Sequence, residues 1–514
     1  MDRQRRSLLG RAAALGAAAW LRPGIAVALA IPKFASYPFT LGVASGSPLP
    51  DGVVIWTRLA PVPLEGGGLG PEPIEVRWEV AHDAAFRRIA AQGMATARAE
   101  AAHSVHVEVA GLEPRREYHY RFMAGSEVSA VGRTCTAPAP GDGDASLRLA
   151  LASCQQYEQG YYVAHRHLAR EEVDVVAFVG DYIYESSWGH DHVRKHGSAI
   201  PYTLAEYRDR YARYKTDADL QRSHAAAPWI VTWDDHEVEN DYANDRSERL
   251  YPHFLERRAA AYRAFIEHMP VRATLRPDGS ARIFGRHEWG RLATLHVLDD
   301  RQYRSHQACP KPNRGGSNVV GPECAERLDG ELTLLGRDQE AWLDEGLAQS
   351  RTQWNLVVQQ TLFVPAGVPG KSGRRYWTDG WDGYPAARER LIASLVARKP
   401  MNPVILGGDV HASYFADVHA RPEDADSPIV AAEFCGTSIT SEGPSAKAVQ
   451  AILEANRHIR YGNGNDRGYV LLDIREGGLQ ARLRAVQTVK RDDSPIANAA
   501  AFVVEPGRPG LQPA

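Results

Sequence analysis

The stretch Val173-Asp174-Val175-Val176-Ala177-Phe178-Val179-Gly180-Asp181-Tyr182-Ile183-Tyr184 joins a nearly continuous apolar run to a glycine and a group of polar residues. A short apolar run of this kind is typical of a strand that is buried on both faces of a parallel sheet. In such sheets, ligands bind beyond the carboxyl ends of the strands. Asp181 is therefore predicted to lie at the binding edge of a sheet, and neighbouring strands should bring further polar groups to the same edge.

The same pattern recurs along the chain on both sides of this stretch. Strands are predicted at residues 147–153, 173–179, 229–233, 292–298, 354–360 and 404–408. Helices are predicted at residues 162–172, 251–268, 336–350 and 384–398. This alternation indicates an α/β layered domain, which we place at residues 145–490.

The chain before this domain is predicted to be all-β. Residues 37–137 contain alternating segments such as Ile74–Val80 and Val105–Val109, separated by turn residues. Leu112 and Pro114, followed by the alternating aromatics of 118–122, have the pattern of a tyrosine corner, which favours a fibronectin-III-like β-sandwich. A Pro/Gly-rich linker follows at 137–144, and residues 491–514 are predicted to form a disordered or surface-draped tail.

Nearly every predicted strand of the α/β domain ends in a group that can bind a metal ion or a phosphate. These groups are Cys154, Asp181, Tyr184, Asp235, His236, Asn240, Arg301, Gln360, Asp409 and His411. Each one alone is weak evidence, because a lone aspartate is more often a helix cap or a turn residue. Several carboxylates at one edge repel one another unless a cation neutralises them. The set therefore predicts a polynuclear metal site, with Asp181 as the bridging ligand.

The composition sets limits on partners. The 514 residues are 44% hydrophobic and 24% charged, with a formal net charge of -3. This balance is ordinary for a globular protein and gives no electrostatic case for nucleic acid or anionic membrane as a specific partner. No stretch after the first 30 residues is long and apolar enough to cross a bilayer.

Residues 1–30 have the order of a twin-arginine signal peptide. Arg5 and Arg6 precede an apolar, alanine-rich run, and a small-x-small cleavage site ends at Ala30. A membrane anchor is the less favoured alternative, because Arg22 and Pro23 interrupt the apolar run. The segment predicts export by the twin-arginine machinery to the periplasm or the exterior.

The chain has five cysteines, and in an oxidising compartment two of them could form a disulfide. Cys309 and Cys324 flank a loop rich in proline, glycine and asparagine, where we favour a disulfide over two unpaired thiols. Cys154 stands among the strand-end groups, and Cys435 is interpreted as a core residue.

Three motifs together resemble the calcineurin-like metallophosphoesterase superfamily. They are Gly180-Asp181-x-x-Tyr184, Asp234-Asp235-His236-Glu237 and Gly407-Gly408-Asp409-x-His411. Within the superfamily the match is to the PhoD-type alkaline phosphatase/phosphodiesterase family. Cys154 stands where most of the superfamily has aspartate, and Asp409 stands where most of it has histidine. The segments 39–48, 54–59, 298–303 and 433–439 are also similar to this family, so the resemblance spans about residues 37 to 490.

The resemblance implies a mixed iron and calcium enzyme. Iron(III) would be held by Cys154, Asp181, Tyr184 and His411. Calcium would be held by Asp181, Asp235 and Asp409, with Asn240 or Gln360 as further ligands. His236 would stabilise the transition state or donate a proton, and a metal-bound hydroxide would be the nucleophile. Arg301 could grip a substrate phosphate, or equally form an ion pair with its aspartate neighbours.

The sequence leaves four functions open. The first is a phosphomonoesterase, and the second is a phosphodiesterase that acts, in the manner of a phospholipase D, on lipid head groups, teichoic-acid-type polymers or nucleotides. The third is a secreted binding protein without catalysis, against which the intact set of ligands argues. The fourth is a structural metal site, which is disfavoured because structural sites are closed and these groups face a crevice.

Overall fold

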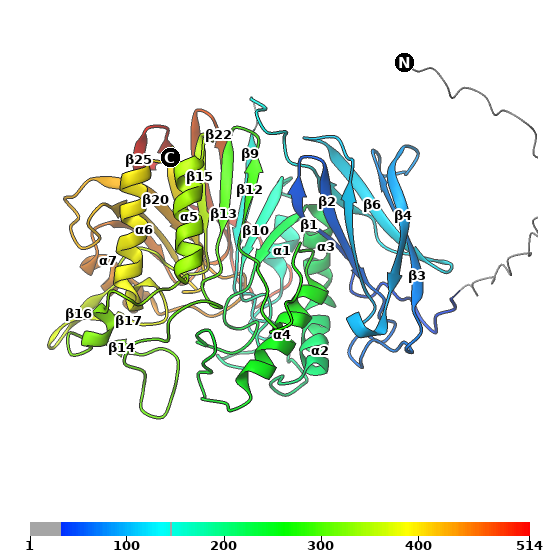
Figure 1. Cartoon of the computed structure of the whole chain (residues 1–514), viewed down its shortest axis with the longest axis horizontal. Helices are drawn as coiled ribbons and strands as arrows, with labels where there is room; N and C mark the ends of the chain where they lie inside the picture. The colour runs from blue at the N-terminus through cyan, green and yellow to red at the C-terminus, as the bar shows by residue number, and fades with distance from the viewer. Residues whose placement is uncertain (1–31, 144–145) are drawn as a thin grey trace, which may run out of the picture.

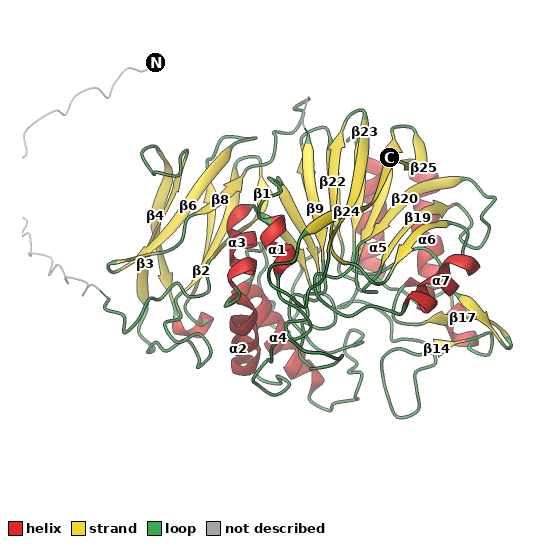
Figure 2. Ribbon diagram, turned by 180° about the vertical axis from the view of Figure 1, so that it is seen from behind, coloured by secondary structure: helices red, strands yellow, loops and turns green. Residues whose placement is uncertain are grey.

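The computed structural model describes residues 32–143 and 146–514, and shows two large sheets packed face to face between layers of helices. The predicted twin-arginine signal lies outside the described residues. Figure 1 looks onto helices α5 (Arg337–Gln349) and α6 (Pro385–Arg398), and Figure 2 looks from behind onto α1 (Val163–Leu168) and α3 (Ala218–Ala226). The α/β layered domain of the sequence analysis is therefore a four-layer α/β/β/α sandwich.

The first sheet has ten strands in the order β25-β24-β23-β22-β9-β10-β11-β1-β2-β5. Its central strands β9, β10 and β11 are parallel neighbours, as short buried apolar runs favour. The bounds are β1 Val43–Leu49, β2 Gly52–Arg58, β5 Ser104–Ala110, β9 Leu147–Ala152, β10 Val175–Val179, β11 Trp229–Thr232, β22 Arg467–Arg475, β23 Gly478–Val486, β24 Ile496–Glu505 and β25 Arg508–Pro513.

The second sheet has seven strands in the order β12-β13-β15-β18-β20-β19-β21. A small sheet of β14, β17 and β16 lies at its lower edge in Figure 1. The bounds are β12 Gly285–Trp289, β13 Ala293–Val297, β14 Val319–Val320, β15 Trp354–Val358, β16 Val368–Gly370, β17 Gly373–Trp377, β18 Pro403–Gly407, β19 Ser413–His419, β20 Ile429–Cys435 and β21 Ile459–Asn463.

The side-chain period of two divides each central strand between two cores. In β10, Val175, Ala177 and Val179 face the second sheet, whereas Val176 and Phe178 face the helices. Helices α1, α2 (Leu204–Lys215), α3 and α4 (Phe254–His268) cover the first sheet, and α5 and α6 cover the second. Because both faces of these parallel strands are packed, the strands hold their positions. The loops at their carboxyl ends are held in place with them.

Three of the N-terminal strands are continuous with the main sheet. β1 pairs with β11 in parallel at Gly46 and Trp229, so β1, β2 and β5 extend the main sheet. A second sheet packs on them, formed by β3 (Ile74–Ala81), β4 (Ile89–Ala97), β6 (Glu117–Ala124), β7 (Glu127–Val128) and β8 (Gly132–Cys135). The Tyr118 hydroxyl accepts a hydrogen bond from the Glu113 N–H at 2.9 Å, as a tyrosine corner would. The fibronectin-III-like assignment is nevertheless not confirmed.

The structure corrects two further predictions. Residues 496–513 are not a disordered tail: β24 pairs with β23 along its length, and β25 pairs with β24. Helices α2 and α3 were not predicted at all, although Thr203 and Glu206 form a capping box at the start of α2. Helix α2 is rich in charged residues, which weakens its apolar pattern in the sequence.

Two further predictions can be compared with the described part of the chain. Cys309 and Cys324 are joined in a disulfide, with a Cα–Cα distance of 6.1 Å. Over the residues that the structure describes, none of the helices combines the length and the apolar character that a bilayer crossing requires.

Candidate metal centre

Loops that follow four strands of the two sheets bring the predicted ligands together. Cys154 follows β9, Asp181 follows β10, Asp235 follows β11, and Asp409 and His411 follow β18. Four of these five residues, all except Asp235, have positive φ between 53° and 65°. A non-glycine residue in this region costs of order 1–3 kcal/mol, and such residues cluster at functional sites because the surrounding structure holds them there. The packed strands on both sides provide that constraint.

The first ligand cluster contains a thiol, a carboxylate, a phenol and an imidazole. Ligand atoms of Cys154, Asp181 and His411 all lie within 4.8 Å of one another. The Tyr184 hydroxyl donates to Asp181 Oδ2 at 2.7 Å and lies 3.1 Å from His411 Nε2. Burial, reinforced by Asp181, raises the pKa of Cys154 and of Tyr184 well above their ordinary values. A bound cation would reverse this effect and favour both anions.

The second cluster consists of carboxylates and shares Asp181 with the first. Ligand oxygens of Asp181, Asp234, Asp235 and Asp409 lie within 4.8 Å of one another. Burial, with the charges of neighbouring aspartates, raises the pKa of Asp181 and of Asp409 well above the usual range. Oδ2 of Asp234 and Oδ2 of Asp409 are buried without a hydrogen-bond partner. Buried carboxylate oxygens without donors fit a cation that supplies the missing charge.

A third cluster extends the site with a residue that the sequence did not indicate. Asp235, Asp241 and Asp379 also place oxygens within 4.8 Å of one another. Asp379 follows β17 in the small sheet. It does not follow a strand of either main sheet, so the strand-end pattern in the sequence did not predict it. Burial, with the charge of Asp379, raises the pKa of Asp241 to about 7.

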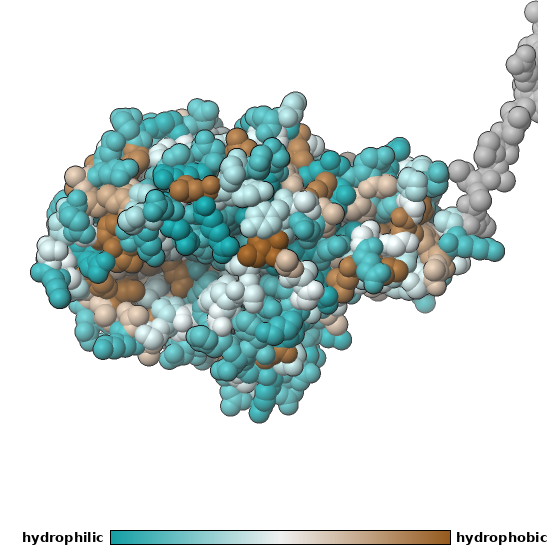
Figure 3. Space-filling view, turned by 90° about the horizontal axis from the view of Figure 1, so that it is seen from below, coloured by the Kyte–Doolittle hydropathy of each residue, from teal (hydrophilic) through white to brown (hydrophobic). Residues whose placement is uncertain are grey.

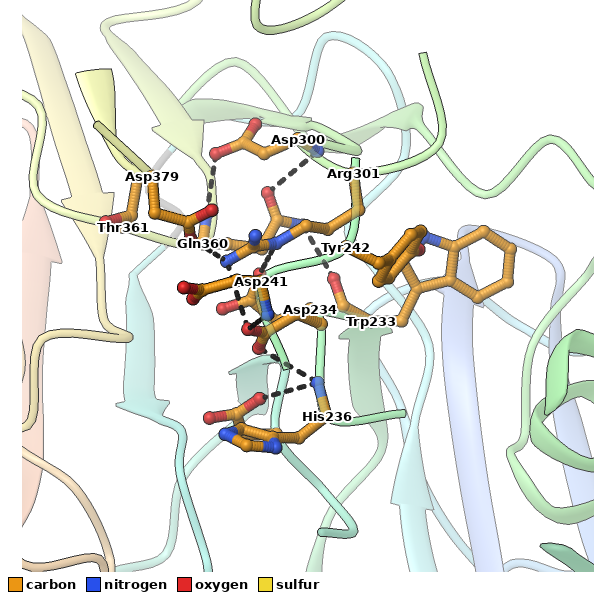
Figure 4. A network of polar contacts seen from close by, with 12 residues as sticks. Trp233, Asp234, His236, Asp241, Tyr242, Asp300, Arg301, Gln360, Thr361 and Asp379 are labelled. Carbon is orange, nitrogen blue, oxygen red and sulfur yellow. Dashed lines mark hydrogen bonds and ion pairs between the residues drawn. The ribbon is translucent and has the colours of Figure 1, made fainter. Parts of the chain in front are cut away.

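The contacts of Arg301 are those of an ion-pair partner and not those of a residue that binds substrate. Its side chain is 1% exposed and pairs with Asp234 at 2.5 Å and Asp379 at 2.7 Å. Figure 4 shows the guanidinium between these carboxylates, and Arg301 does not line the cleft. Burial alone would raise the pKa of Asp235, but Arg301 and His236 outweigh burial and hold that pKa below its ordinary value. Arg301 thus favours the ionised form of Asp235 from behind the site.

The ring nitrogens of the two histidines have distinct partners. His411 Nδ1 lies 2.9 Å from the Glu442 carbonyl oxygen, to which it donates, which leaves Nε2 available to bind a metal. Burial lowers the pKa of His411 to about 3, so its ring is neutral, as a ligand must be. His236 Nδ1 lies 2.6 Å from Glu185 Oε2. Burial opposes the charge of His236, yet Glu185 and the site aspartates raise its pKa well above the usual value.

The two amide candidates differ in availability. Asn240 lines the cleft, and its backbone N–H donates to Glu185 at 3.2 Å. The side-chain amide of Gln360 is committed elsewhere: Nε2 donates to Thr232 and to two backbone carbonyls, and Oε1 accepts from Asp300. Of the two amides, Asn240 is therefore the better placed to bind a metal.

A cleft of about 660 Å³ opens over these clusters. Asp235, His236, Asp409 and His411 line it, and so do Arg249 and Arg314. Apolar side chains also line it, and Figure 3 shows brown surface in and around the hollow on the left of this face. A cleft of this size, with a few convergent polar groups, is typical of a small-molecule site.

A four-layer sandwich with anionic ligand clusters beneath a cleft is the arrangement expected of a metal-dependent hydrolase. The family model described as PhoD-like phosphatase matches residues 149–483, and the model of the N-terminal domain of these phosphatases matches residues 25–138. The chain therefore belongs to the PhoD-like phosphatase family, and it is a phosphoester hydrolase.

Individual relatives agree with this assignment. The chain is 46% identical over 496 residues to alkaline phosphatase D of Bacillus subtilis (strain 168), which covers 94% of this chain and 83% of the relative. A solved structure of PhoD superposes with a TM-score of 0.89 and 44% identity, over 94% of this chain and 93% of that one. Purple acid phosphatase PPD1 of yellow lupin (Lupinus luteus) shares the fold, with a TM-score of 0.53 and 11% identity over 91% and 74% of the two chains.

Proposed function

We propose that this phosphoester hydrolase uses a centre of iron(III) and calcium, and that phosphodiesters are its preferred substrates. The observation that carries the proposal is the position of Asp181. A fourth ligand cluster joins Asp181 to Asp235 and His236, so Asp181 belongs to three of the four clusters among the described residues. A carboxylate shared in this way would hold two cations close together. Two cations roughly 3.5–4 Å apart can clamp the attacking and leaving oxygens of a phosphoryl transfer.

The donor chemistry supports the assignment of the metals. Cys154 and Tyr184 offer a thiolate and a phenolate, which are anionic donors suited to iron(III), and His411 adds a neutral imidazole. Asp235, Asp409 and Asn240 offer oxygen atoms alone, which suit calcium. Asp181 is the ligand that the two groups share.

The chain's own residues fulfil three tasks in hydrolysis. When bound, the metal ions supply Lewis acidity and lower the pKa of water. His236 is held by Glu185 through Nδ1, so Nε2 remains to donate a proton to the leaving oxygen. Arg301 keeps Asp235 ionised from behind the site. The strained backbone at Cys154, Asp181 and His411 fixes the ligands before substrate binds.

The openness of the cleft favours diesters over monoesters. Among the described residues that line it, the last in sequence is Ile452, because the C-terminal residues form strands β24 and β25 instead. Figure 1 places the chain end at the upper edge, opposite the small sheet beside the cleft. A second ester group therefore has room beside the phosphate. The alternative of a binding protein without catalysis is set aside, since the chain belongs to a phosphatase family.

The proposal is tested by comparing two chromogenic esters. Bis-p-nitrophenyl phosphate should be hydrolysed with a higher kcat/KM than p-nitrophenyl phosphate, and chelation should abolish both activities. Elemental analysis should find iron and calcium in the active protein. Faster hydrolysis of the monoester would overturn the diester preference, and full activity after complete removal of metal would overturn the metal centre.

We further propose that the chain is exported by the twin-arginine pathway to the periplasm or the exterior. The support is the Arg5–Arg6 pair with its apolar run, together with the disulfide, which suits an oxidising compartment. Replacing Arg5 and Arg6 together with lysine should retain the protein in the cytoplasm, as cell fractionation would show. Unchanged export of that variant would contradict the proposal.

A further inference from the structure

The cleft has an apolar compartment that the hydrolytic chemistry does not use. We define it by six of the apolar side chains that line the cleft: Leu362, Val364, Trp377, Val410, Tyr414 and Ile452. They come from the loop after β15, the end of β17, the loop after β18, the start of β19, and helix α7 (Ala446–Ala455). Five separate segments thus converge on one apolar wall.

The apolar compartment is firmly built. Leu362, Val364 and Tyr414 are 7%, 3% and 2% exposed, and all three belong to the core beneath the second sheet. Trp377 and Ile452 are half-buried and also line the cleft. A wall anchored in the core keeps its shape without a ligand, and such pre-formed apolar surfaces are typical of small-molecule sites.

The apolar compartment is continuous with the metal centre. Val410 lies in sequence between Asp409 and His411, and all three residues line the same cleft. A phosphate at the ligand clusters therefore lies next to this wall. An inorganic phosphate or a small polar ester would leave the wall exposed to water, whereas an apolar ester group would cover it.

We propose that the apolar compartment binds the apolar alcohol group, alkyl or aryl, of a phosphodiester whose phosphate lies at the metal centre. This inference rests on the proposed function and adds the substrate class. Burial of apolar surface then contributes to affinity in proportion to the length of the group, until the chain extends beyond Ile452.

The inference is tested with n-alkyl(methyl)phosphinates on the metal-loaded protein. These compounds are monoanions like a phosphodiester, and both of their organic groups are held by phosphorus–carbon bonds, which are not hydrolysed. As the alkyl group grows from methyl to pentyl, the inhibition constant should fall about threefold to fourfold per methylene. A phenyl member should bind more tightly than the methyl member. Quenching of tryptophan fluorescence gives a binding readout that is independent of activity.

Two variants locate the effect. Trp377→Ala and Ile452→Ser should each flatten the dependence of the inhibition constant on chain length. Trp342→Ala is the matched control, because Trp342 is also half-buried but packs on Phe284, with ring centroids 5.0 Å apart, and does not line the cleft. It should leave the whole series unchanged. Thermal unfolding of each variant checks that the fold is retained.

The outcomes separate the inference from the function on which it rests. Equal inhibition by the methyl and pentyl members, with diester hydrolysis intact, would overturn the apolar compartment as a substrate site and leave the proposed function standing. Chain-length dependence that survives in both variants would place the alkyl group elsewhere and would also overturn it. No inhibition by any member, together with no diester hydrolysis by the metal-loaded protein, would overturn both.

Discussion

Replacing Asp181 with asparagine is expected to lower kcat/KM for bis-p-nitrophenyl phosphate by well over 100-fold and to release metal from the protein. Loss of a residue that only supports a ligand typically costs about 10–100-fold in metal affinity or activity. Asp181 should cost more, because its carboxylate belongs to three ligand clusters at once. Asparagine tolerates the positive φ of 56° at this position, so the backbone should survive the change.

The same substitution is also expected to raise the thermal stability of the metal-free protein. Burial and the neighbouring carboxylates raise the pKa of Asp181, so its charge destabilises the fold when no cation is present. Metal-free Asp181→Asn should therefore unfold at a higher temperature than the metal-free wild type. Asp344→Asn, on the outer helix α5 and paired with Arg398, is the control for both measurements. Wild-type metal content and wild-type rate in Asp181→Asn would contradict the bridging role.

Replacing His236 with asparagine is expected to lower kcat by about 10²–10⁴-fold while the metal content stays at its wild-type value. The loss should be larger for an ester with a poor leaving group, such as an alkoxide, than for p-nitrophenolate, because a poor leaving group depends more on the proton. Steady-state kinetics with matched diesters measures the difference.

A Glu185 variant tests whether this carboxylate positions His236. Its carboxylate lies 2.6 Å from His236 Nδ1 and also accepts from the Asn240 N–H. Glu185→Gln should reproduce the leaving-group dependence of the His236 variant with a smaller loss. A uniform loss for good and poor leaving groups in both variants would assign His236 to the binding of substrate and not to proton transfer.

The sequence could predict the centre of the molecule because its signals there are local. The apolar runs of β9, β10 and β11 and the polar groups that follow them lie within a few residues of one another, and the structure brings Cys154, Asp181 and Asp235 together at one edge. Because sites lie beyond the carboxyl ends of strands, the residues that follow these strands could be predicted to meet at one edge.

The remainder depended on contacts between distant segments. Asp379 reaches the site from the small sheet. Its neighbours in the sequence do not distinguish it from an ordinary turn residue. Arg301 looked equally suited to a phosphate or to an ion pair, and only the folded chain places Asp234 and Asp379 around it. The parallel pairing of β1 with β11 joins residues 183 positions apart in sequence, at Gly46 and Trp229, so no local pattern could show that the N-terminal strands extend the main sheet.

The most direct test of the metal centre is anomalous X-ray diffraction from crystals of the active, metal-loaded protein, measured above and below the iron edge. The account predicts an iron peak among Cys154, Asp181, Tyr184 and His411. It also predicts a second, non-iron cation on the other side of Asp181, about 3.5–4 Å away. A single isolated ion, or cations that leave Asp181 without a bond to metal in an active crystal, would contradict the account.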